Sequence, residues 1–81
     1  MRPRGDKRRS KPGGPAAAGA WLDLGLRHAS AGELDAASRA YARAEAADPN
    51  DFRAPFSLAT LDLQRGAPER ALPRLRRVTR L

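Results

Sequence analysis

The chain has 81 residues, which is enough for at most one small domain. It has no cysteine and one histidine, which excludes a disulfide framework and leaves too few nitrogen and sulfur ligands for a transition-metal site. Its net charge of +7 comes from 14 arginines and two lysines against nine acidic residues. Such a balance suits an anionic partner, but it is also typical of proteins from GC-rich genomes.

Residues 1–17 form a basic segment rich in glycine and proline. Its six basic side chains are Arg2, Arg4, Lys7, Arg8, Arg9 and Lys11. The segment has no large apolar residue after Met1, so burial cannot offset its chain entropy, and we predict a disordered tail. It fits neither a secretory signal nor a membrane span, so we expect a cytoplasmic protein.

From residue 18 onward, apolar side chains recur at the spacing of an α-helix. Trp21, Leu24 and His28 share one helical face. Gly32 is expected to end this helix, because glycine adopts the left-handed conformation without strain. The spacing predicts a second helix over residues 34–44.

Pro49 is expected to close the second helix, with Asn50 or Asp51 capping a third. Pro55 then falls in the first turn of the third helix, where backbone amides have no intrahelical partner. A fourth helix beginning near Pro68 would contain Pro73 in its interior. The sequence therefore predicts an all-α chain with about four helices.

The chain resembles itself when it is shifted so that Gly32 falls on Gly66. Under the same shift, which we call the repeat period, Ala37 falls on Ala71. Other apolar and small positions coincide in the same way: Leu24 with Leu58, Gly25 with Ala59, and Tyr41 with Leu75. The sequence therefore divides into one unit at residues 18–51 and a second, truncated unit at residues 52–81.

This period and its signature residues resemble the tetratricopeptide repeat, whose pattern is W-x2-L-G-x2-Y, then A-x3-F, then P. The matching positions are Trp21, Leu24, Gly25, Ala37, Tyr41 and Pro49 in the first unit and Leu58, Ala59 and Ala71 in the second. The second unit departs from the pattern, with Pro55 at the tryptophan position and Asp62 at the tyrosine position.

The resemblance implies antiparallel helix-turn-helix units stacked as in an α-solenoid. In such units the large residue fills the space between the two helices, so Trp21 is expected in the core. Gly25 and Ala37 would let the two backbones approach closely. His28 is expected to be a partly buried packing residue.

The resemblance also implies a non-enzymatic scaffold that binds a protein, a peptide or a partner helix in a groove. The positions expected to face that groove are Leu22, Leu26, Ser30, Arg53, Phe56, Thr60 and Gln64. No catalytic residues, metal or cofactor are expected, since no nucleophile–base pair or phosphate-binding glycine loop is present.

The last helix supports alternatives to groove binding. With the basic tail, its five arginines between residues 70 and 80 would suit nucleic acid or another anionic surface, although no exposed aromatic residues or base-reading motif support this. Its apolar residues would otherwise serve self-association, docking on a partner, or the next unit of a longer repeat array; they are Leu72, Leu75, Val78 and Leu81.

Overall fold

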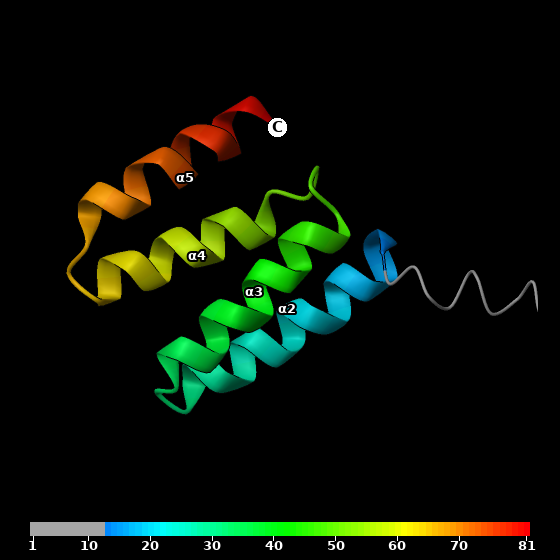
Figure 1. Ribbon diagram of the computed structural model, residues 1–81, viewed down its shortest axis with the longest axis horizontal. Coiled ribbons are helices and arrows are strands. Elements are labelled where there is room, and N and C mark those ends of the chain that lie inside the picture. The colour runs from blue at the N-terminus through cyan, green and yellow to red at the C-terminus, as the bar shows by residue number, and fades with distance from the viewer. Residues whose placement is uncertain (1–12) are drawn as a thin grey trace, which may run out of the picture.

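The computed structural model describes residues 13–81, which form four α-helices and no strand (Figure 1). The helices are α2 (Gly14–Ser30), α3 (Leu34–Ala47), α4 (Arg53–Gln64) and α5 (Pro68–Arg80). The predicted all-α class with four helices is confirmed. The six basic side chains of the predicted tail lie outside the described residues.

Helix α2 begins earlier than the sequence analysis expected. The boundary at residue 18 lies inside the helix, so residues 14–17, which we assigned to the tail, are helical. Pro15 stands in the first turn, where its fixed φ suits a helix and its missing amide removes no hydrogen bond. The alanines that follow are the strongest helix formers.

The helices form two hairpins that meet through α3. Helix α2 packs on α3, α4 packs on α5, and α3 also packs against α4 (Figure 1). The core cluster joins both hairpins and consists of Leu22, Ala37, Tyr41, Ala44, Ala54, Leu58 and Leu61. Two of the three α3 residues in it, Ala37 and Ala44, are alanine, and the third is Tyr41.

The two hairpin turns share one geometry at equivalent positions of the repeat. Gly32 has a φ of +80° and Gly66 a φ of +74°. In each turn, the residue after the glycine donates its amide to the carbonyl of the residue four positions before the glycine. Glu33 donates to His28 and Ala67 donates to Asp62, both at 2.8 Å. These bonds satisfy carbonyls at the helix end that would otherwise lack a partner. Gly32 and Gly66 thus end α2 and α4, as their positions predicted.

Gly25 on α2 lies directly against Tyr41 on α3. A Cβ atom on Gly25 would lie 2.5 Å from Cε1 of Tyr41, whose residue is only 2% exposed. Tyr41 therefore fills the space between the helices, and Trp21, which we expected in the core, is only half-buried beside it. The guanidinium carbon of Arg43 lies 5.1 Å from the centroid of the Trp21 ring, a cation–π arrangement.

Two further signature residues are not buried. Leu24 is 38% exposed, and Pro49 is exposed as well. Leu24 lies on a face of α2 that no described helix covers, and Pro49 lies in the loop after α3. The remaining signature positions are buried: Gly25, Ala37, Tyr41, Leu58, Ala59 and Ala71.

The prolines and the cap of the second hairpin lie close to their predicted places. Pro55 is fully buried in the first turn of α4, and Pro73 lies inside α5. The capping position of α4 is Phe52, one residue after the predicted candidates. A carboxylate oxygen of Asp51 nevertheless accepts the Arg53 amide at 2.9 Å.

A candidate peptide-binding groove

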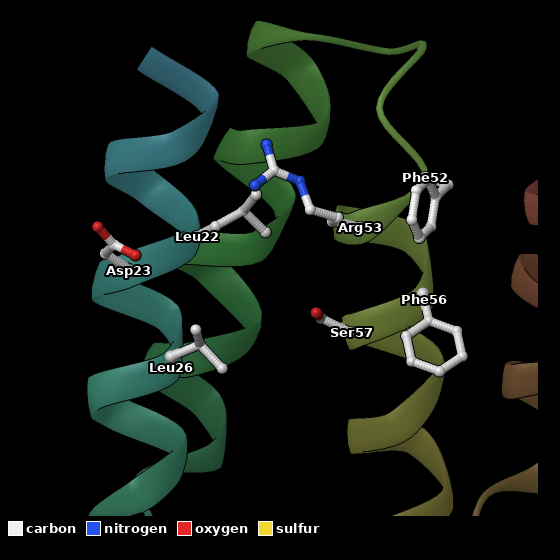
Figure 2. Close-up of a pocket in the computed structure, with 7 residues that line it drawn as sticks. All are labelled: Leu22, Asp23, Leu26, Phe52, Arg53, Phe56 and Ser57. Carbon is white, nitrogen blue, oxygen red and sulfur yellow. The ribbon is translucent and has the colours of Figure 1, made fainter. Parts of the chain in front are cut away.

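A hollow of about 210 Å³ lies between α2 and α4 (Figure 2). Both helices pack on α3 more extensively than on each other, so α3 forms the floor of the space between them. The hollow is lined by Leu22, Asp23 and Leu26 from α2 and by Phe52, Arg53, Phe56 and Ser57 from the start of α4. In Figure 2, Leu22 and Leu26 point from α2 toward Arg53 and Ser57.

A second hollow of about 280 Å³ continues the first along α4. The two share Leu26, Phe56 and Ser57, and the second extends to Thr60 and Gln64. Tyr41 of α3 lines it from below. Together the two hollows form one groove, which we call the α2–α4 groove.

The walls of the α2–α4 groove expose large apolar side chains. Leu26 is 55% exposed, Phe52 is 55% exposed and Phe56 is 51% exposed. Phe52 and Phe56 are four residues apart, and the Phe56 amide donates to the Phe52 carbonyl at 3.1 Å, so their rings lie one helical turn apart. Contact with a ligand would remove this apolar surface from water, which is favourable.

The charged group at the mouth of the groove is already paired. The Arg53 guanidinium donates to both carboxylate oxygens of Asp51, at 3.0 Å from Nε and 2.5 Å from Nη2. These hydrogen bonds hold the pKa of the Asp51 carboxyl below its ordinary value and raise the pKa of Arg53. Arg53 is therefore held in place by its partner, which weakens its attraction for a ligand anion.

The floor of the groove carries one buried phenol. Burial raises the pKa of Tyr41, and a hydrogen bond with Ser57 opposes part of that shift. The Tyr41 hydroxyl therefore stays protonated at neutral pH. It gives the floor a neutral polar group within an apolar surround.

The structure brings together six of the seven residues expected at the groove. Leu22, Leu26, Arg53, Phe56, Thr60 and Gln64 line the two hollows. Ser30 lines neither, and Leu22 is only 6% exposed, so it belongs mainly to the core. Whether these residues bind a partner stays a prediction.

Three residues that line the first hollow were not predicted: Asp23, Phe52 and Ser57. Phe52 precedes α4, so the helical spacing of the third helix did not include it. Asp23 and Ser57 occupy equivalent positions in the two units, so the repeat period relates them to each other. Applying that period to polar positions, and not only to apolar ones, would have suggested them as a pair.

The arginines of α5 are partly engaged within the molecule. The Arg74 Nε lies 2.9 Å from the Asp62 carboxylate, and the Arg77 Nε lies 3.0 Å from the Glu45 carboxylate. These two ion pairs connect α5 to α4 and to α3. They neutralise part of the positive charge that α5 would otherwise offer to a nucleic acid or another anionic surface. Leu72 on the same helix is 51% exposed.

Comparison with protein-family models, with curated proteins and with solved structures found no match for this chain. Membership of the tetratricopeptide repeat family therefore stays a prediction. Within residues 13–81, no helix has the length and apolar character needed to cross a membrane. The same residues contain no cluster of three acidic or histidine side chains that could hold a metal ion.

Proposed function

We propose that the chain is a non-enzymatic protein-interaction module that binds an extended peptide or a partner helix in the α2–α4 groove. The observation that carries the proposal is that one hollow between α2 and α4 is lined by Leu26, Phe52 and Phe56, each more than half exposed. Large exposed apolar side chains gathered in a concavity are typical of interaction sites.

The two adjoining hollows of the groove have volumes of about 210 and 280 Å³. Each hollow is large enough for one apolar side chain. The polar groups at the rim and floor, Asp23, Arg53 and Tyr41, would orient the backbone of the ligand.

The proposal is tested by selecting ligands for the full chain from a displayed library of random peptides and measuring their affinity by fluorescence anisotropy. We expect Phe56→Ala to weaken binding by about tenfold or more, because a buried aromatic contact is often worth about 2 kcal/mol. The matched control is Leu63→Ala, since Leu63 is also on α4 and 53% exposed but lines neither hollow.

Salt distinguishes this function from anion binding. Binding in an apolar groove should change little as salt is raised, whereas contacts with phosphates weaken steeply. Peptides that bind the Phe56→Ala and Leu63→Ala variants equally well, or only at low salt, would contradict the proposed groove.

A further inference from the structure

A second surface of α2 is open on the side away from the α2–α4 groove. Trp21 and Leu24 lie on it, with Trp21 half-buried and Leu24 38% exposed. They line a hollow of about 450 Å³ together with His28, two alanines of α3, and Arg39 and Arg43. We call this surface, defined by Trp21, Leu24, His28, Arg39 and Arg43, the outer face.

The repeat period shows how the equivalent positions are covered in the second hairpin. The counterparts of Trp21, Leu24 and His28 are Pro55, Leu58 and Asp62, and all three are buried. Leu58 belongs to the core cluster that includes residues of α3, Asp62 pairs with Arg74 of α5, and α4 as a whole packs against both α3 and α5. Among the described residues, no helix occupies the corresponding place on α2.

The contact that holds α3 in that place involves an arginine with a counterpart on the outer face. Arg77 of α5 corresponds to Arg43 of α3. Its Nε lies 3.0 Å from the carboxylate of Glu45, and its Nη2 donates to the carbonyl of Pro49 at 3.5 Å. Glu45 lies in the last turn of α3 and Pro49 in the loop that follows, so Arg77 binds the C-terminal end of the covering helix.

Arg43 is positioned to make the same kind of contact. Its guanidinium lies over the ring of Trp21, 5.1 Å from the centroid, and the structure shows no ion pair between Arg43 and a carboxylate of residues 13–81. The guanidinium therefore lies within cation–π distance of the ring, and its N–H groups can still bind a carboxylate.

We infer that the outer face docks a helix of a partner protein that is rich in alanine and carries a glutamate or aspartate in its last turn. The template is α3, in which seven of 14 residues are alanine and Glu45 is the acidic group. Small side chains would let the backbone approach Trp21 and Leu24, and the carboxylate would pair with Arg43. This surface is separate from the groove and its function does not depend on that proposal.

Charge excludes the nearest alternative occupants of the outer face. Arg39 and Arg43 give the outer face two positive charges, while His28 is hydrogen-bonded to the carboxylate of Glu33 at 2.7 Å. The α5 helix of a second copy carries five arginines, and the chain's own residues 1–12 carry six basic residues against one acidic residue. Both would be repelled by like charge, whereas an acidic helix is attracted.

The docking site can be tested on the full chain with a synthetic peptide of residues 33–51, which contains α3 and Glu45 but no tryptophan. Trp21 is the only tryptophan of the chain, so its fluorescence reports directly on the outer face. We expect a saturable change in Trp21 emission on adding the peptide. The Arg43→Glu variant should bind about tenfold more weakly or worse, because it places two like charges together.

A charge swap separates docking from any effect on folding. A peptide carrying Glu45→Lys should bind the wild-type chain weakly and the Arg43→Glu chain better than the unchanged peptide does. The matched control is Arg70→Glu, which makes the same charge change on the exposed surface of α5 and should leave the affinity unaltered. Circular dichroism of each variant checks that the helices are retained.

Three results would overturn the inference. The first is an unchanged Trp21 emission at saturating peptide, and the second is a change that the charge swap at Arg43 does not affect. The third is a Trp21 emission that depends on chain concentration alone, together with a dimer mass by light scattering, which would assign the outer face to a second copy. None of these results bears on the Phe56→Ala test of the groove.

Discussion

The two hairpins have the same turn, but different contacts hold the two helices of each hairpin together. In the first, the ring of Tyr41 lies against the backbone of Gly25, with no Cβ between them. In the second, the equivalent positions are held by Leu75 and Ala59, and Ala59 does have a Cβ. The first hairpin therefore depends on the absence of one methyl group, and the second does not.

The second hairpin relies instead on a partly buried ion pair. Asp62 is 5% exposed, and its carboxylate lies 2.9 Å from the Nε of Arg74. The first hairpin has His28 and Ala40 at these positions and can form no such pair. The same turn geometry therefore occurs with two kinds of contact between the helices. One is the tight packing of Tyr41 on Gly25, and the other is the ion pair between Asp62 and Arg74.

The largest expected effect on stability comes from adding a methyl group at Gly25, where α2 packs on Tyr41. Gly25→Ala would place a Cβ atom 2.5 Å from Cε1 of Tyr41, closer than packed carbon atoms approach. Because the ring is buried and cannot move without opening the core, we expect a loss of about 2–3 kcal/mol in the free energy of unfolding. Urea denaturation followed by circular dichroism measures it.

The control for this substitution lies on the same helix, nearer its start. A Cβ atom on Gly19 would meet nothing within 4 Å. Gly19→Ala should therefore stabilise the chain by up to about 1 kcal/mol through helix propensity alone. If both variants shifted the urea midpoint in the same direction, Tyr41 would not be packed on Gly25 as described.

The helix boundaries could be predicted because their signals are local. Gly32 and Gly66 are marked by residue type, and the prolines at 15, 55 and 68 all lie in first turns of helices. The start of α2 was predicted too late, because the basic, glycine-rich composition of residues 1–17 obscured the helix-start position of Pro15 and the helix propensity of the alanines after it.

Burial was harder to predict, because it depends on which helices are neighbours. Trp21 and Leu24 match a repeat signature whose residues are buried, yet within residues 13–81 no helix lies over their side of α2. The pairing of Asp62 with Arg74 was missed as well, since the two lie on different helices and no local pattern relates them. The apolar residues of the groove were predicted more completely because the repeat period places them on one face.

A smaller effect on stability is expected when the ion pair between Arg74 and Asp62 in the second hairpin is removed. Arg74→Ala leaves the carboxylate of Asp62 buried without its partner, which we expect to cost about 1–2 kcal/mol. The effect stays below that at Gly25 because the Arg74 side chain is 32% exposed and water can replace part of its contact. Arg70→Ala, an exposed change on the same helix, should cost little.

A second substitution tests whether the loss comes from the unpaired carboxylate of Asp62 or from the ion pair itself. Adding Asp62→Leu to Arg74→Ala removes the unpaired carboxylate and makes the second hairpin apolar, like the first. Most of the lost stability should then return, since buried ion pairs are often replaced by apolar residues at little cost. A double variant less stable than Arg74→Ala would mean that the ion pair itself, and not the isolated carboxylate, determines the loss.

The smallest effect is expected where the two hairpins differ in how they begin. No side chain caps α2, whereas Asp51 accepts the Arg53 amide at the start of α4 and pairs with its guanidinium. Asp51→Asn keeps an oxygen for the amide but loses the ion pair, so we expect a loss of about 0.5–1 kcal/mol at neutral pH. Asp48→Asn, in the same loop, should cost less, because Asp48 accepts one amide at 3.3 Å.

The dependence of this effect on pH has a definite sign. The folded-state pKa of Asp51 lies below its ordinary value of 3.8, so the ionised form is favoured by folding. The contribution of Asp51 is therefore present above that value and is lost as the pH falls through the lowered pKa. Urea unfolding of wild type and Asp51→Asn at successively lower pH measures the free energy of unfolding of each. The difference between the two free energies should narrow below pH 3.8.

A free-energy difference that stayed constant across this pH range would show that the charge on Asp51 does not stabilise the start of α4. The distinction between the two hairpins would then reduce to their interior contacts, Tyr41 on Gly25 in one and Arg74 on Asp62 in the other.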